Sequence, residues 1–266
     1  MSTPETPFPD LPNIGIKFPH SPITIAALAY TKQHTTEATY NHCIRAAYWA
    51  LILAKKLPAF SQPSPERPLN IETVVLAAVL HDMGWATTKA LVSPDKRFEV
   101  DGANLAYAFA GRYAGEGAEA WAGSENEMRR RTVWDAIALH CTASLALHHP
   151  APEVALAHLG ITADFLGPRF PPGDGSVLSE DEYRAVVARF PMAGFGVEVL
   201  KGVMCGLCRV KPETTYDNFV GAFGVRFGVV GWGTGGEEFA SEIERREPVG
   251  MLLGGLGYLE GLLKGE

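Results

Sequence analysis

Apolar residues recur along this chain mostly at intervals of three and four, which is the spacing of one face of an α-helix. Residues 38–56 show the pattern well, with Ile44, Tyr48 and Leu51 on one face of the predicted helix. The short alternating patterns that are typical of strands are almost absent. Further helices are predicted over residues 22–33, 71–80, 100–113, 124–140, 153–166, 179–189, 195–210 and 216–227. The pattern therefore predicts an all-α fold, a bundle of helices.

Capping residues support several of these helix starts. Ser21, followed by a proline, is a favoured N-cap with proline at the first helical position. The S-x-x-E spacing of a capping box begins at Ser124 and again at Ser179. We expect residues 1–20 to form an extended, proline-rich arm, and residues 21–266 to form a single domain with a glycine-rich C-terminal segment.

One stretch joins a long apolar run to two chemically active side chains. Residues 71–80 are strongly apolar and lead directly to His81 and Asp82, with Gly84 two residues further on. We interpret the run as a buried helix whose end places an imidazole beside a carboxylate. Gly84 is expected to supply the left-handed residue at which the chain leaves the helix. Both groups bind divalent transition metals, although a hydrogen-bonded pair at a helix end explains the dipeptide alone equally well.

A metal site needs three or four convergent ligands, and other predicted helices offer them. His42 lies within the apolar helix 38–56, and His140 ends the helix 124–140. Asp164 lies in an equally apolar part of the helix 153–166. Histidines and acids on apolar helices favour a shared site over isolated histidines of a core.

The order of these residues along the chain resembles the metal signature of the HD-domain superfamily. Within that superfamily the chain looks like the fungal cyanamide hydratase (urea hydro-lyase) group. The similarity covers most of residues 20–225, and the glycine-rich residues 228–236 depart from it. It rests on Ser21-Pro22, Thr39-Tyr40-Asn41-His42 with Arg45, His81-Asp82-Met83-Gly84, Phe98-Glu99-Val100-Asp101-Gly102-Ala103, Ala138-Leu139-His140-Cys141-Thr142, Leu159-Gly160-Ile161-Thr162-Ala163-Asp164 and Tyr216-Asp217-Asn218-Phe219.

The resemblance implies an HD-domain helical bundle with four metal ligands, His42, His81, Asp82 and Asp164. It favours Zn²⁺ as the cofactor, although nitrogen and oxygen donors also suit Fe²⁺ or Mn²⁺. It further implies a zinc-dependent hydro-lyase that adds water to a small nitrile-like substrate through a metal-activated hydroxide. Cyanamide would then give urea, and the partner is a small-molecule substrate.

Several further residues are candidates for catalytic roles, each with an ordinary structural alternative. His140 can hydrogen-bond the substrate or carry a proton, or instead satisfy a carbonyl at a helix end. Lys89 and Thr88 follow the metal motif and can donate into the pocket, although a solvated loop explains them equally well. Glu99 is a candidate proton carrier or a partner of a ligand histidine. Arg45, one helical turn past the first ligand histidine, is expected to pair with a buried acid.

Three other functions remain as alternatives. A metal-dependent phosphohydrolase of nucleotides or small phosphate esters needs basic side chains to hold phosphate, and few lie near the motif. A di-iron oxygenase would need one more histidine between residues 82 and 140, where the sequence has none. A non-enzymatic scaffold protein would keep the four predicted ligands without a use for them, and metal analysis distinguishes it.

Composition limits the kinds of partner. The net charge of −7 argues against nucleic acid, which calls for a basic face. No run of 18 apolar residues and no secretory signal is present, so no membrane association is expected. The four cysteines make no disulfide framework at this length, and we expect a cytoplasmic protein. The apolar, glycine-rich segment 251–263 is able to pack against a partner subunit, which would make a homo-oligomer.

Overall fold

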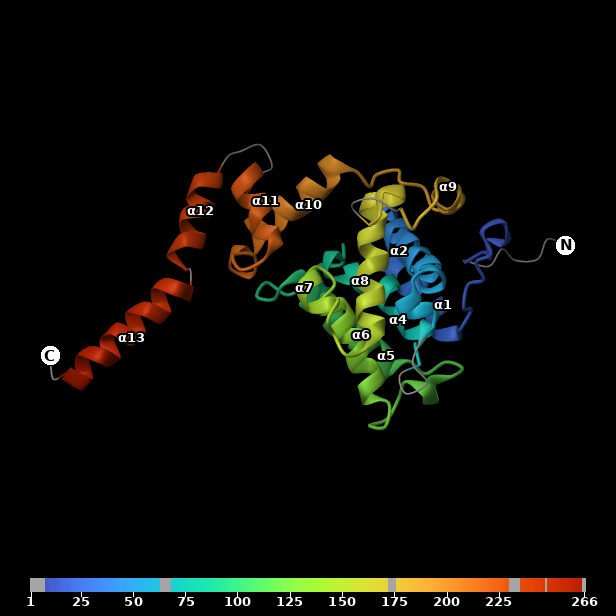
Figure 1. Ribbon diagram of the computed structural model, residues 1–266, viewed down its shortest axis with the longest axis horizontal. Helices are drawn as coiled ribbons and strands as arrows, with labels where there is room; N and C mark the ends of the chain where they lie inside the picture. Colours follow the sequence, from blue (N-terminus) through green and yellow to red (C-terminus); the bar gives the residue numbers. More distant parts are fainter. Residues whose placement is uncertain (1–7, 63–67, 172–175, 230–234, 247, 265–266) are drawn as a thin grey trace. The chain divides into compact units, whose positions relative to one another are not determined.

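Helices make up the ordered secondary structure of the protein (Figure 1). The computed structural model describes residues 8–62, 68–171, 176–229, 235–246 and 248–264. Their α-helices are α1 (Pro22–His34), α2 (Glu37–Lys56), α3 (Pro58–Ser61), α4 (Ile71–Leu80), α5 (Phe98–Arg112), α6 (Glu127–Ala138), α7 (Ala143–Ala146), α8 (Pro152–Leu166), α9 (Glu180–Arg189), α10 (Val197–Val210), α11 (Phe219–Phe227), α12 (Gly236–Arg245) and α13 (Pro248–Lys264). These described residues contain no strand, so the all-α prediction is confirmed.

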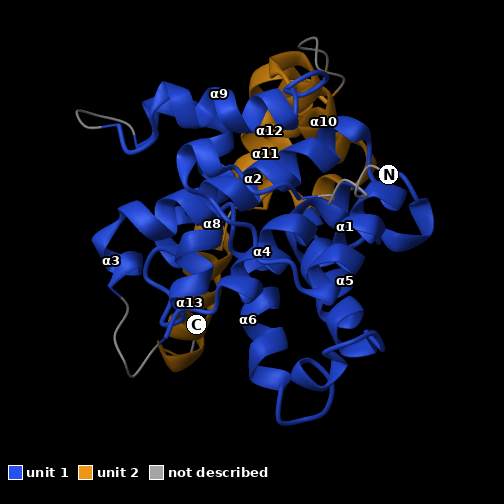
Figure 2. Ribbon diagram, turned by 90° about the vertical axis from the view of Figure 1, so that its right-hand side faces the viewer, with its two compact units in different colours: residues 1–195 blue, residues 196–266 orange. Residues whose placement is uncertain are grey.

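The chain divides into two compact units, which Figure 2 shows in blue and orange. Unit 1 comprises residues 1–195 and holds α1 to α9, and unit 2 comprises residues 196–266 and holds α10 to α13. The single domain that the sequence analysis expects, residues 21–266, includes both units. All the candidate metal and catalytic residues belong to unit 1.

Helix α4 is the centre of unit 1. It packs against α1, α2, α6 and α8, and its residues from Thr73 to Leu80 are all buried. A helix that is apolar on every side has to be surrounded in this way, which explains the unbroken apolar run. Helix α8 also lies along α2 at close range, because a Cβ atom on Gly160 would come within 2.7 Å of the Ala46 carbonyl oxygen.

The N-terminal segment folds onto α2 where the structure describes it. Residues 1–7 of the expected arm lie outside the described residues. Phe8 and Phe18 stack with ring centroids 3.8 Å apart, and both pack against Tyr48. The Tyr48 hydroxyl donates to the Pro9 carbonyl oxygen at 2.6 Å. The described part of the arm therefore contributes to the core.

Two of the three predicted capping residues are confirmed and one is wrong. The Ser21 and Ser179 side chains each accept from a backbone N–H three residues on, at the starts of α1 and α9. Helix α6 instead begins after Asn126, whose side chain makes no capping bond. Its amide donates to the Glu119 and Ala122 carbonyl oxygens of the preceding turn. That turn takes up the residues around Ser124, so its predicted capping box does not form.

Unit 2 contains two helices that the sequence pattern does not predict, α12 and α13. Helix α10 packs on α11, where the thiols of Cys205 and Cys208 lie close to the Phe223 and Val220 carbonyl oxygens. Both cysteines are buried free thiols. The glycine-rich sequence hides the helical period here, and residues 230–234 lie outside the described residues. None of the helices that the structure describes has the length and apolar character needed to cross a membrane.

Candidate metal centre

The end of α4 presents the two residues of the central motif. The chain continues from α4 into a 3-10 segment, His81–Trp85, and both His81 and Asp82 are fully buried. The prediction that Gly84 is left-handed is wrong, since it is absent from the glycines with positive φ. Its role is steric, because a Cβ atom there would lie 1.9 Å from the Phe98 carbonyl oxygen. The first residue of α5 thus rests directly on this turn.

Three ligand atoms from two segments converge at this point. The Nε2 atoms of His42, on α2, and His81 lie 3.2 Å apart. One oxygen of Asp82, Oδ2, lies 3.2 Å from Nε2 of His81 and 3.6 Å from Nε2 of His42. These three residues form the group among the described residues whose ligand atoms lie close enough to hold one metal ion.

The opposite nitrogens of both rings fix their tautomers. Nδ1 of His42 lies 2.6 Å from Oδ2 of Asp164, and Nδ1 of His81 lies 2.8 Å from the Ala78 carbonyl oxygen. Because both partners are acceptors, each Nδ1 carries a proton, and Nε2 of each ring faces the other ring. Two ring nitrogens and a carboxylate thus face one another, an arrangement that needs a positive charge between them, either a proton on His81 or a metal ion.

The Asp82 carboxylate fits a bound divalent cation. Both of its oxygens are buried and have no hydrogen-bond partner, which is costly for a charged group. Burial raises the pKa of Asp82, but the positive charge at His81 lowers it to a net value below the ordinary one. Burial likewise lowers the pKa of His81, but the charge of Asp82 raises it to well above its usual value. The lowered pKa of Asp82 and the raised pKa of His81 both mean that a positive charge is favoured between the three ligand residues.

Asp164 lies on the other side of the His42 ring and is not part of this group. Its Oδ2 also accepts from Arg45 Nη2 at 2.8 Å, while its Oδ1 accepts from Arg45 Nε at 2.8 Å and Trp49 Nε1 at 2.7 Å. Burial raises the pKa of Asp164, but the hydrogen bonds from His42 and Arg45 lower it to about 2. Asp164 thus lies outside the group of His42, His81 and Asp82, and its assignment as a metal ligand stays a prediction. In the structure both of its oxygens accept hydrogen bonds, which is the arrangement of a residue that orients a ligand histidine.

His140 lies beside the group. Its ring meets the His81 ring edge to face with centroids 5.0 Å apart, and its side chain is buried. Nδ1 of His140 lies 2.6 Å from the Ile137 carbonyl oxygen, so its Nε2 carries a lone pair. The residue therefore satisfies a helix-end carbonyl, as one of the two sequence interpretations expects, and its catalytic role stays a prediction. Burial and the positive charge at His81 lower its pKa to about 3.

The other three catalytic candidates are Glu99, Thr88 and Lys89, and only Glu99 is buried. Glu99 is buried at the start of α5, where it accepts from Arg97 Nη2 at 3.1 Å. Thr88 pairs with His34 Nδ1 at 2.9 Å, and Lys89 is exposed. The structure brings neither Thr88 nor Lys89 into contact with the metal group, and their segment faces solvent instead.

Sequence reasoning missed the aromatic residues that cover His42. The Phe195 ring stacks on the His42 ring at 4.3 Å with an interplanar angle of 15°. Phe165 meets the same ring at 5.2 Å and 66°. Phe195 is the first residue of the helix predicted over residues 195–210 and lies just before α10, and the apolar pattern there does not indicate a contact with His42. Trp49, in contrast, follows Arg45 by four residues on α2, and this spacing on one helix face could have identified it.

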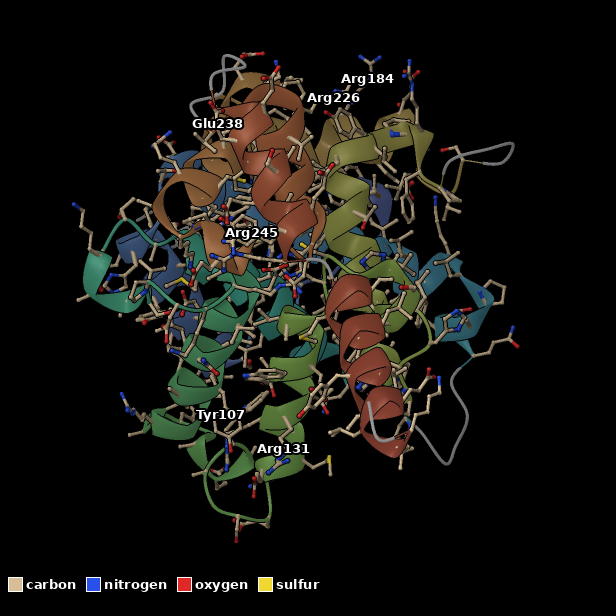
Figure 3. All side chains as sticks on the ribbon, turned by 90° about the vertical axis from the view of Figure 1, so that its left-hand side faces the viewer. Tyr107, Arg131, Arg184, Arg226, Glu238 and Arg245 are labelled. Carbon is tan, nitrogen blue, oxygen red and sulfur yellow. The ribbon has the colours of Figure 1, made fainter. Side chains whose placement is uncertain are left out.

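The centre is enclosed. His42, His81 and Asp82 are each 1% exposed or less. A cavity of about 900 Å³ lies between the N-terminal segment and the ends of α2 and α4, and none of these three residues lines it. A second, of about 420 Å³, lies between α5 and α6, where Figure 3 shows Tyr107 and Arg131 near one another. Neither cavity is lined by a residue of the metal group.

The family comparison agrees with this geometry. Residues 39–158 match the HD domain family. The matched segment lies in unit 1 and includes His42, His81, Asp82 and His140, and it ends before Asp164. No curated protein matches the chain. Residues 39–158 are therefore similar to the HD domain family, a similarity that indicates a metal-dependent hydrolytic enzyme, and His42, His81 and Asp82 form a possible site for a divalent metal.

Proposed function

We propose that this protein is a zinc-dependent hydratase that adds water to a small nitrile-like substrate, converting cyanamide to urea. The proposal rests on the enclosed group of His42, His81 and Asp82, where three lone-pair atoms converge with no proton donor between them. The resemblance of the surrounding segments to the cyanamide hydratase group supports the choice of substrate. The donor set would also accept Fe²⁺ or Mn²⁺.

Each residue of the centre has a role that follows from its contacts. His42, His81 and Asp82 would hold the metal, which when bound supplies Lewis acidity and lowers the pKa of a water at the site to around 7. Asp164 holds His42 in the tautomer whose Nε2 faces the metal position, and the Ala78 carbonyl does the same for His81. These rings need no reorganisation before the reaction.

Hydration of cyanamide to urea also requires two proton transfers from water to the nitrile nitrogen. The water oxygen bonds to the nitrile carbon, a π-electron pair moves onto the nitrogen, and one water proton reaches that nitrogen to give isourea. The second proton then moves from this oxygen to the same nitrogen, which gives urea, and a carrier is needed above all for the first proton. Glu99 is suited to carry this proton, because burial raises its pKa, although the nearby Arg97 charge opposes the shift. The lone pair on Nε2 of His140 is able to accept a hydrogen bond from the attacking water.

A phosphohydrolase is the second candidate, and the match to the HD domain family favours it. Phosphate recognition needs cationic side chains that are free to bind it. Arg45 is paired with Asp164 and also donates to the Phe190 and Pro191 carbonyl oxygens. Arg97 is paired with Glu99. These engaged cations and the enclosure of the centre favour the small neutral substrate.

Metal analysis combined with two activity assays tests the proposal. We expect the purified protein to contain about one zinc per chain and to release urea from cyanamide. We expect no phosphate release from nucleotides or small phosphate esters. Phosphate release without urea formation would replace the hydratase with the second candidate, and a metal-free, inactive protein would contradict both.

A further inference from the structure

Three buried side-chain nitrogen or oxygen atoms among the described residues have no hydrogen-bond partner. Two are the oxygens of Asp82, and the third is Nε1 of Trp85. A bound cation accounts for the carboxylate. The indole N–H is a donor that no metal satisfies, and a buried donor without an acceptor calls for an explanation.

The other tryptophan N–H groups of unit 1 with described partners show what is usual in this protein. Trp49 Nε1 donates to Asp164 at 2.7 Å, and Trp134 Nε1 donates to Asn104 Oδ1 at 2.9 Å. The Phe98 ring next to Trp85 does not replace such a partner. The two rings are tilted by only 36°, with centroids 5.3 Å apart, so the N–H in the indole plane does not point into the face of Phe98.

Trp85 is joined to the metal group through the chain and through ring contacts. It ends the 3-10 segment His81–Trp85, which begins with two of the three ligand residues. Its ring begins an aromatic wall that leads back to a ligand. Phe98 meets the His140 ring at 5.7 Å, and His140 meets the His81 ring at 5.0 Å.

We propose that the indole N–H of Trp85 is a substrate-binding donor of this centre. It would donate to the nitrile nitrogen, which gains negative charge as the water oxygen bonds to the carbon and the π-electron pair moves onto nitrogen. The site would thus select small molecules that carry an acceptor at the end away from the attacking water. The identity of the ligand rests on the proposed hydratase function, whereas the unpartnered donor does not.

The first test compares two tryptophan substitutions. W85F keeps an aromatic ring and removes the donor, and we expect kcat/KM for cyanamide to fall about 3- to 10-fold. Metal content and thermal midpoint should remain those of the wild type. W134F is the matched control, because it removes an N–H that already has a partner outside the centre. We expect W134F to keep the wild-type kcat/KM within about twofold.

The second test observes the N–H itself in the wild-type, metal-loaded protein. The ¹⁵N-labelled indole resonance of Trp85, assigned by its loss in W85F or from the wild-type spectrum alone, should shift when cyanamide, urea or azide is added. The Trp134 resonance should not move. This measurement requires neither turnover nor a folded variant.

The outcomes separate the two proposals. Urea formation with unchanged kinetics in W85F and an unmoved Trp85 resonance would overturn the role of Trp85 and leave the hydratase standing. Absence of urea formation would overturn the hydratase. In that case a Trp85 resonance that shifts with any of the three probes still supports the donor, and one that shifts with none overturns it.

Discussion

The two aspartates of the centre have opposite environments, and their contacts decide their roles. Both oxygens of Asp82 lack a hydrogen-bond partner, and Oδ2 lies in the group of ligand atoms. Asp164 uses both oxygens to accept hydrogen bonds from His42, Arg45 and Trp49. A carboxylate that is already bonded on both oxygens orients a ligand ring, whereas an unpartnered one is able to bind the metal directly.

Asparagine substitutions separate these roles. We expect Asp82→Asn to lose stoichiometric metal, because it removes a charged ligand from the group. Asp164→Asn should keep the metal, with an affinity about 10- to 100-fold weaker, because His42 loses its orienting partner. Metal content and competition with a chelating dye measure both. If Asp164→Asn lost its metal as completely as Asp82→Asn, Asp164 would be a ligand after all.

Glu99 gives a dependence on pH. Its pKa is raised in the folded protein, so the stability that its protonated form contributes is present below its ordinary value of 4.5. This contribution is lost as pH rises through the raised pKa. We expect Glu99→Gln to remove the part of the fall in unfolding free energy with rising pH that Glu99 causes. Unfolding in urea at several pH values measures this change. The same variant should hydrate cyanamide about 100-fold more slowly or worse. A variant with the pH profile and rate of the wild type would rule out both roles.

At the scale of elements, the contact between α5 and the turn after α4 sets the position of the metal motif. Gly84 lies against the Phe98 carbonyl, and a Cβ atom on Gly102 would come within 2.7 Å of the His81 carbonyl oxygen. The two glycines allow the helix to approach the backbone that carries His81 and Asp82. Close approach of backbones, and not a left-handed conformation, is therefore the reason for glycine at both positions.

We expect Gly84→Ala to destabilise the protein by about 3 kcal/mol, because α5 or the turn must move to make room. Metal affinity should fall at the same time, since the turn holds two of the three ligand residues. Gly111→Ala is the control, because its Cβ atom would meet only Arg130 at an ordinary 3.5 Å. That substitution should be neutral or slightly stabilising in α5. Denaturant unfolding and metal titration measure both variants, and equal effects would contradict the steric explanation.

For the whole molecule, we propose α13 as the surface through which the chain would form a homo-oligomer. None of its residues is buried, and Val249, Leu252, Leu256, Leu259 and Leu263 are each at least 51% exposed. Their alternating spacing of three and four is that of the core positions of a coiled coil. A second copy of the same helix supplies the matching apolar row, so we expect the chain to associate through α13.

Leu256→Glu should weaken this association more than about 100-fold, because a charge would replace the central apolar residue of each copy. Gly254→Ala is the control, since a Cβ atom there meets nothing and the residue lies away from the row of leucines. Sedimentation analysis over a range of concentrations measures both. A wild-type chain that stays monomeric at all concentrations would disprove the association.

Prediction from the sequence succeeded where the signal is local and failed where contacts across the chain decide. The apolar period of α2 and that of α4 are each set by residues close together in the chain, and the Ser21 and Ser179 caps each bond a residue three positions on. The turn before α6 displaced the expected cap at Ser124 through bonds to carbonyls outside the helix. The helices α12 and α13 were not predicted because glycines before α12 and within α13 disfavour a helix by their intrinsic propensity.

The amino-acid sequence alone determined the helical class and the kinds of ligand, since helical periodicity and the chemistry of His42, His81 and Asp82 are properties of the residues themselves. Only the tertiary structure decided which oxygen faces a metal. The bonds that join Asp164 to His42, Arg45 and Trp49 cross separations of 115 to 122 residues. No pattern within one helix records which partner a buried carboxylate meets, because that depends on how α2 and α8 approach each other.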